Sequence, residues 1–308
     1  MAFYSPDPAM AQILTDLVRA LELDGRPGLA HRLAITWVRY PRPLPDAAQA
    51  PPVGRGASWE GDRQWYPASV VKLVYLIAAE AWLQRGLLEE DPELRRALAL
   101  MIQDSSNDAT GLVVDLLTGT TSGPALPPQL MHTWCEQRQL VNQWLGGLGW
   151  PELEGVNACQ KTWGDGPFGR ESDFYGAQLV ENRNRLSTDA TARLLEAVMA
   201  SGLVSPPACS RMQAVLARSL DPDQRAADPE NQVDGFLGEG LPATAQLWSK
   251  AGWMSAARHD AAYVQAEGHD PFLLVAFSEG ASCAEDTTLL PEIARQLSAA
   301  CKLEDPGC

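Results

Sequence analysis

A serine and a lysine stand three positions apart in YPASVVKLVYLIAAE, residues 66–80, at the head of an apolar run. A Pro-Ala pair precedes Ser69 and marks the expected start of a helix, so Ser69 and Lys72 would share one helix face. A serine hydroxyl needs an adjacent base to act as a nucleophile. A lysine desolvated among apolar neighbours can have its pKa lowered enough to be that base. The simplest alternative is a capping serine beside an unrelated lysine.

Two later segments carry side chains of complementary chemistry. Ser105–Ser106–Asn107 lies at a junction between two apolar helical stretches and offers a hydroxyl and an amide. Lys250–Ala251–Gly252 lies on an expected strand, where small residues allow a ligand to approach and the lysine offers a cation to a carboxylate. Taken singly, the first segment is explained by helix capping and the second by a solvated strand lysine.

The three motifs occur in the order S-x-x-K, S-x-N, K-x-G, each in its expected structural context. In this respect the chain resembles the penicillin-recognising serine hydrolases, most closely the class A β-lactamases, over roughly residues 10–303. ARHDAAYV (257–264) is similar to the family segment that opens the strand after K-x-G. NRNRLSTDATARLLEAV (182–198) is similar to the start of the helix that follows the family's omega loop.

The resemblance implies a catalytic group in the first two motifs. Ser69 would be the acylated nucleophile and Lys72 its proton-shuttling partner. Ser105 would relay the proton to the leaving group, and Asn107 would hold Lys72 and the substrate amide.

The third motif would bind the substrate. By the same resemblance, Lys250, Ala251, Gly252 and Trp253 would form the substrate-binding strand, with Lys250 attracting a carboxylate. The backbone N–H groups of Ser69 and Trp253 would form the oxyanion hole.

The chain departs from the family pattern at several positions. Ser106 replaces the aspartate of the second motif, and Ala251 replaces the threonine of the third. The lost hydroxyl removes a hydrogen bond to a charged group, worth about 1.5–3 kcal/mol. Only 36 residues (105 − 69) separate Ser69 from Ser105, which is shorter than in class A enzymes and predicts a more open cleft on that side.

The carboxylate that releases the acyl group has two candidates, Asp165 and Glu171, in the segment CQKTWGDGPFGRE (159–171). Neither has the family's spacing, and each is more simply explained as a surface charge on a loop. The leading hypothesis is a β-lactamase-like serine hydrolase that cleaves an amide or ester bond through an acyl-Ser69 intermediate. The alternatives are a DD-peptidase-like or esterase-like enzyme that deacylates slowly with β-lactams, and a non-catalytic binding protein.

Hydrophobic periodicity predicts an α/β (α+β) protein. Helices are expected at 10–22 and 288–303, and strands at 32–40, 245–253, 260–267 and 271–280. Between these lie expected helices at 69–85, 92–103, 107–117, 127–146, 187–202 and 207–218, with 41–56 and 147–186 as loops. We therefore expect an antiparallel sheet with flanking helices built from 1–64 and 216–308, an inserted all-α domain at 65–215, and the active site in the cleft between them.

Composition limits the partners. The formal net charge of −15 argues against nucleic acid or an anionic membrane surface, and no apolar run is long enough to span a membrane. We expect a monomer that acts on a small-molecule or peptide-like acyl substrate, with no cofactor and no metal. No signal peptide is visible, so the expected compartment is the cytoplasm, or the periplasm if a leader has been removed. The six cysteines are expected to be thiols, with a Cys135–Cys159 disulfide as the alternative.

Overall fold

The computed structural model describes residues 3–44, 51–176, 180–228 and 230–303. The contacts divide the chain into two units. The first consists of residues 1–63 and 187–308, and the second of residues 64–186.

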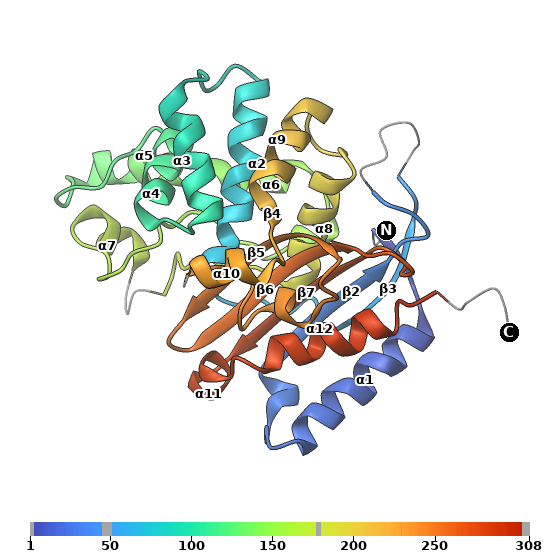
Figure 1. The fold of residues 1–308 in the computed structure, drawn as a ribbon. Coiled ribbons are helices and arrows are strands. Elements are labelled where there is room, and N and C mark those ends of the chain that lie inside the picture. The colour runs from blue at the N-terminus through green and yellow to red at the C-terminus, as the bar shows by residue number, and fades with distance from the viewer. Residues whose placement is uncertain (1–2, 45–50, 177–179, 229, 304–308) are drawn as a thin grey trace, which may run out of the picture. The chain divides into compact units, whose positions relative to one another are not determined.

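A seven-stranded sheet forms the centre of the first unit, in the order β1-β3-β2-β7-β6-β5-β4 (Figure 1). The β1–β3 pair is parallel and the other pairs are antiparallel. The strands are β1 Tyr4–Pro6, β2 Leu33–Arg39, β3 Gly54–Trp59, β4 Ala217–Arg218, β5 Gln246–Met254, β6 Ala257–Gln265 and β7 Phe272–Glu279. The predicted fold class, with a sheet built from both chain ends, is confirmed.

Helices of the first unit cover both faces of its sheet. Side chains alternate between the faces along a strand, so Ile35 and Trp37 of β2 point one way and Thr36 the other. Ile35 and Trp37 join a buried apolar cluster with residues of α1 and α12, whereas Thr36 donates a 2.6 Å hydrogen bond to Asp189 of α8. The helices of this unit are α1 Pro8–Leu23, α8 Thr188–Met199, α9 Pro206–Leu216, α10 Pro222–Ala227, α11 Ala281–Glu285 and α12 Leu289–Ala299.

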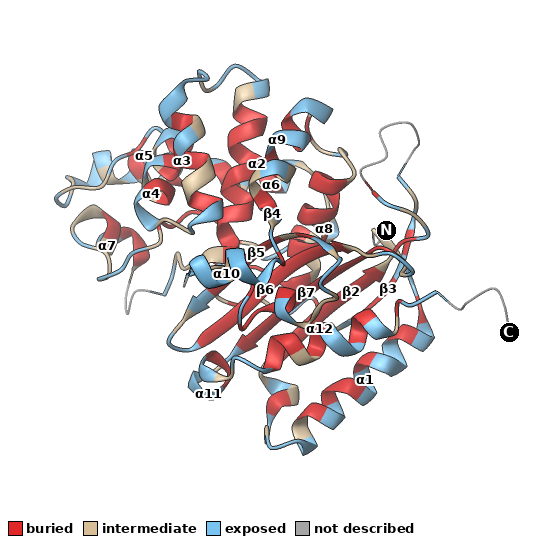
Figure 2. Cartoon of the chain, viewed as in Figure 1, coloured by how far each residue is buried: buried red, intermediate tan, exposed pale blue. Residues whose placement is uncertain are grey.

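The second unit is built from helices around α2, which is buried on all sides over Val71–Trp82 (Figure 2). A helix that is apolar all round is typical of a central position, and α2 contacts both α3 and α4. The helices of this unit are α2 Val71–Gln84, α3 Pro92–Gln103, α4 Asn107–Thr118, α5 Pro128–Arg138, α6 Leu140–Gly147 and α7 Arg170–Tyr175. Short 3-10 turns lie at Leu29–His31, Ala68–Val70, Pro151–Leu153 and Leu237–Gly240.

The second expected domain boundary, at residue 215, differs from the observed one at 186. Residues 187–215 belong to the sheet unit because α8 contacts β2, β6 and β7, and α9 contacts β5. The first boundary, between 63 and 64, lies one residue from the predicted position.

Two local predictions also need correction. The loop predicted at 41–56 ends in β3, where the strand signal is hidden by Gly54 and Gly56. A Cβ atom at Gly54 would lie 2.4 Å from Val38 Cγ1, so close strand packing requires the glycine. The single helix predicted at 127–146 is two helices that break at Gln139.

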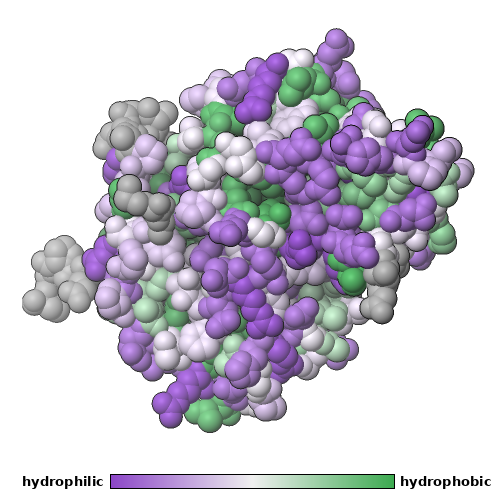
Figure 3. Space-filling view, turned by 180° about the vertical axis from the view of Figure 1, so that it is seen from behind, coloured by the Kyte–Doolittle hydropathy of each residue, from purple (hydrophilic) through white to green (hydrophobic). Residues whose placement is uncertain are grey.

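The surface is consistent with the acidic composition. Hydrophilic residues predominate on the face seen in Figure 3, and hydrophobic ones lie in small groups among them. Within the described part of the chain, no helix is long and apolar enough to cross a membrane. Cys135, Cys159, Cys209, Cys283 and Cys301 are free thiols, so the alternative disulfide is not formed, and Cys308 lies outside the described residues.

Candidate active site

The serine of S-x-x-K stands on a strained turn. Ala68, directly before Ser69, has φ +46°, a left-handed conformation that non-glycine residues seldom adopt. A 3-10 turn over Ala68–Val70 then leads into α2, with Ser69 half-buried. Val70 is the N-cap residue of α2 and Pro67 that of the 3-10 turn. Among the described residues, no side chain donates or accepts a capping hydrogen bond at either position. Ser69 is therefore not the capping serine of the simpler explanation, and the strain is of a kind that clusters at functional sites.

Lys72 is the second residue of α2 and is fully buried. Its ammonium donates to the Ser105 carbonyl, to Ser105 Oγ at 3.2 Å and to Asn107 Oδ1 at 2.8 Å. Burial lowers the pKa of Lys72 to about 7, because a charged amine is poorly solvated there. At neutral pH a large fraction of the amine is therefore uncharged, which is the form that can accept a proton.

The three residues of the S-x-N motif make different contacts. Ser106 caps α4 by accepting a 3.2 Å hydrogen bond from the Ala109 N–H, as the simpler explanation of the motif expects. Ser105, which precedes the cap, has φ +54°, and Asn107 is the first residue of the helix. The cap thus holds Ser105 and Asn107 on either side of it, where both contact Lys72.

The structure brings Lys72, Ser105 and Asn107 together, whereas Ser69 stands on the same helix start without a direct bond to Lys72. No hydrogen bond of the described residues joins Lys72 Nζ to Ser69 Oγ. Catalytic hydrogen bonds are often long in a ligand-free site and tighten when substrate binds.

The K-x-G motif lies within β5 in the first unit. Lys250 is buried, and its ammonium donates to Gln232 Oε1 and, at 2.7 Å, to the Ala251 carbonyl. Gly252 pairs with His259 across the strands. Trp253 is 59% exposed, and its indole N–H donates to the Ala284 carbonyl at 3.1 Å. Gln232 carries no motif that would have identified it from the sequence.

Glu171 is not the surface charge that the sequence suggested. It is fully buried on α7 and forms an ion pair with Arg138, whose Nη2 and Nη1 donate to its two oxygens at 2.5 and 3.2 Å. Ser122 Oγ donates to the same carboxylate at 2.7 Å and receives a 2.8 Å hydrogen bond from Lys161. Both carboxylate oxygens of Glu171 are thus already engaged by donors.

A second acidic residue, Asp115, belongs to the same buried group of charged side chains. Asp115 of α4 accepts from Lys161 at 2.6 Å and from Arg138 at 3.2 Å. Burial raises the pKa of Asp115, although Lys161 and Arg138 act against that rise. The cluster of Asp115, Arg138, Lys161 and Glu171 balances two cations with two carboxylates. The other candidate base, Asp165, is exposed on the loop.

In the described part of the segment predicted as a long loop, 147–176 and 180–186, side-chain amides hold the backbone. Asn184 Oδ1 accepts from the N–H groups of Cys159 and Gln160, at 3.0 and 2.9 Å. Asn142 Oδ1 accepts from the Ala158 N–H at 2.7 Å. These bonds replace the ladder that a regular element would supply, so little periodicity is needed in the sequence.

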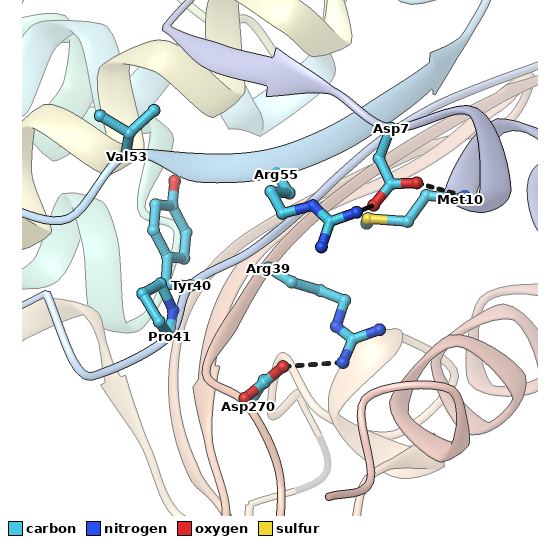
Figure 4. Close-up of a pocket in the computed structure, with 8 residues that line it drawn as sticks. All are labelled: Asp7, Met10, Arg39, Tyr40, Pro41, Val53, Arg55 and Asp270. Carbon is cyan, nitrogen blue, oxygen red and sulfur yellow. Dashed lines mark hydrogen bonds and ion pairs between the residues drawn. The ribbon is translucent and has the colours of Figure 1, made fainter.

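The first unit also contains a cavity of about 310 Å³, which is lined by residues outside the three motifs (Figure 4). Arg39 pairs with Asp270 at 2.7 Å and Arg55 with Asp7 at 2.8 Å, so each guanidinium there is matched by a carboxylate. None of the predicted site residues lines this cavity.

A comparison with known proteins assigns the chain to a family. A family model described as "Beta-lactamase enzyme family" matches residues 88–301, more than half of the chain. The chain belongs to the beta-lactamase enzyme family. That match includes the second and third motifs of this family member but begins after Ser69 and Lys72. Among curated proteins, no sequence matches it.

Solved structures show the same fold at low identity. A β-lactamase from Sphaerobacter thermophilus DSM 20745 is 19% identical with a TM-score of 0.65, covering 96% of this chain and 99% of that one. PBP-A is 17% identical with a TM-score of 0.63, covering 96% and 97%. A β-lactamase from Chitinophaga pinensis DSM 2588 is 17% identical with a TM-score of 0.63, covering 94% and 99%.

The Arg138–Glu171 pair predicts a strong dependence of stability on both partners. Arg138→Met leaves a buried carboxylate short of its main partner, so it should lower the free energy of unfolding by about 3 kcal/mol. Adding Glu171→Leu should restore most of that loss, as measured by urea denaturation of the single and double variants.

Arg96→Met is the matched control, because Arg96 pairs with Glu93 on an exposed helix face. It should change the free energy of unfolding by less than about 1 kcal/mol. Equal effects of Arg138→Met and Arg96→Met would contradict a buried, tightly coupled pair.

Proposed function

We propose that this protein is a serine hydrolase that cleaves an amide or ester bond through an acyl-enzyme on Ser69. The observation that carries the proposal is the buried Lys72, with a pKa of about 7, against Ser105 and Asn107. The fold and the family model support it.

The chemistry follows from these positions. The neutral Lys72 amine takes the proton of Ser69 as Oγ attacks the substrate carbonyl, giving a tetrahedral oxyanion. Ser105, within hydrogen-bond distance of Lys72, passes the proton to the leaving nitrogen or oxygen as its bond to the acyl carbon breaks. Water then attacks the ester, and Ser69 recovers its proton. Lys250, together with the strand through Trp253, binds the substrate and attracts its carboxylate.

The state of Glu171 favours slow release of β-lactams. Its two oxygens already accept from Arg138 and Ser122, so activating a water would require one of these bonds to break. Asp165, the other candidate, is exposed on the loop. We therefore propose a DD-peptidase-like profile, in which β-lactams acylate Ser69 and leave slowly. One solved structure with this fold is an acyl-enzyme complex of a PBP-A mutant with penicillin-G.

Benzylpenicillin should add its full mass to the protein, and the adduct should persist for hours. Intact mass spectrometry at intervals after removal of the free penicillin, in neutral buffer, gives both the yield and the lifetime. Ser69→Ala should abolish the adduct, whereas Ser210→Ala, which removes an exposed hydroxyl from α9, should leave it unchanged.

An adduct that survives in Ser69→Ala would exclude Ser69 as the nucleophile. An adduct that clears within seconds would instead indicate an effective base for deacylation and a true β-lactamase.

The rate of acylation should rise with pH. Lys72 must be neutral to accept the Ser69 proton, and its pKa is lowered from 10.5 to about 7. Below that pKa the rate should fall about tenfold per pH unit, and above pH ~8 it should level off. Stopped-flow labelling with a fluorescent penicillin between pH 5 and ~9 measures the profile, and a rate that falls as the pH rises would contradict this role.

A further inference from the structure

Two arginines lie directly opposite each other near one end of the pairing between β2 and β3. Arg39 of β2 is in register with Arg55 of β3, and direct partners in an antiparallel pair point to the same face of the sheet. Along β2 this is the face on which Ile35 and Trp37 join the apolar core. The row of buried apolar side chains therefore ends in two adjacent guanidinium groups.

Each of these guanidinium groups is held by a carboxylate through one nitrogen only. Asp270 pairs with Nη2 of Arg39 at 2.7 Å, and Asp7 pairs with Nη2 of Arg55 at 2.8 Å. A guanidinium has five N–H donors. Among the described residues, no acceptor contacts Nε or Nη1 of either arginine. Donors of both groups therefore remain for a ligand, and like charges in this position would gain from an anionic group between them.

The four charged side chains line the cavity of about 310 Å³ in the sheet unit (Figure 4). In Figure 4 the two guanidinium groups lie between the two carboxylates, with Asp7 next to Arg55 and Asp270 next to Arg39. The other lining residues are Met10, Tyr40, Pro41 and Val53. The cavity thus combines charges of both signs with apolar surface, and its volume suits a small ligand.

The two carboxylates differ in what remains for a ligand to bind. Asp7 caps α1, so its Oδ1 accepts from two N–H groups of the first helical turn while its Oδ2 pairs with Arg55. Asp270 uses Oδ2 for Arg39, and no described residue donates to its Oδ1. A negatively charged acceptor is therefore available at Asp270, beside the remaining donors of the two arginines.

This set of charges matches a ligand that carries both signs. Two guanidinium groups and two carboxylates sum to zero, so a simple anion would be attracted by the arginines and repelled by the aspartates. A zwitterion meets a complementary group at each of its charges. Because Arg39 and Asp270 are in direct contact, the two charges of the ligand must also be adjacent. In an α-amino acid a single carbon separates the ammonium from the carboxylate.

We propose that this cavity is a binding site for a free α-amino acid with an apolar side chain. The carboxylate of the ligand bridges Arg39 and Arg55, its ammonium contacts Oδ1 of Asp270, and its side chain packs against the apolar part of the lining. All eight lining residues belong to the sheet unit, and the site is independent of the reaction proposed for Ser69.

Racemic leucine tests the proposal, with N-acetyl-leucine and leucinamide as comparators that lack the ammonium and the carboxylate. In a ¹H–¹⁵N NMR titration of the wild-type protein, leucine should give saturable shifts with a Kd of about 1 mM, as expected for so small a ligand. Each comparator should bind at least about tenfold more weakly, because it leaves one set of charges without a partner.

Two substitutions separate the contributions of the two charges. Arg55→Met should weaken leucine binding at least about tenfold, because the carboxylate loses one of its two guanidinium groups. Asp270→Asn should also weaken leucine binding, but it should tighten the binding of N-acetyl-leucine, because it removes a negative charge beside the arginines.

Arg96→Met is the matched control, since it removes an exposed, ion-paired guanidinium from α3 in the other unit. It should leave the Kd of all three compounds unchanged. Thermal unfolding of each variant verifies that it is folded at the temperature of the titration.

Three results would overturn the inference. They are the lack of a saturable shift with leucine up to about 50 mM, similar Kd values for all three compounds, and equal effects of Arg55→Met and Arg96→Met. The first two are measured on the wild-type protein, so they do not depend on the folding of a variant. None of the three involves Ser69, so the proposed function stands or falls separately.

Discussion

A lysine ammonium buried against three oxygen atoms is the interaction on which the site around Ser69 depends. Lys72 lies near the start of a helix that is buried on all sides, and desolvation there lowers its pKa to about 7. The cap at Ser106 keeps the oxygens of Ser105 and Asn107 in place against it. Burying a charge in this way costs several kcal/mol of stability, a cost that is typical of functional sites.

The use of lysine across the chain follows the same pattern. The sequence contains only four lysines but 20 arginines (24 − 4). Lys72, Lys161 and Lys250 are buried, and only Lys302 is exposed. A buried lysine amine can lose its proton near neutral pH, whereas a guanidinium stays charged, so lysine suits the positions where a proton must be accepted or a compact charge is needed. In the Arg138–Glu171 pair, by contrast, a guanidinium donates two hydrogen bonds to a buried carboxylate.

Part of this arrangement was predictable from the sequence because it depends on short spacings. The helix that begins just after Ser69 and carries Lys72, and the helix junction at Ser105–Asn107, both follow from local patterns in the sequence. The sheet built from both ends of the chain was predictable from the strand patterns in those two regions. By contrast, the partners of Glu171 and Lys250 come from segments far away in sequence. Arg138 and Gln232 have no local signal that distinguishes them from surface residues, and β3 was hidden by the glycines that its close packing requires.

The pKa of Lys72 is the most direct test of this account. With lysine labelled by ¹³C at Cε, the spectrum should contain four side-chain signals, and Lys72→Arg identifies the one of interest. The exposed Lys302 serves as an internal reference. A titration midpoint near 7 for Lys72 is the predicted result. A midpoint near the ordinary value of 10.5 would show that the amine is fully charged at neutral pH and would contradict its role as the base.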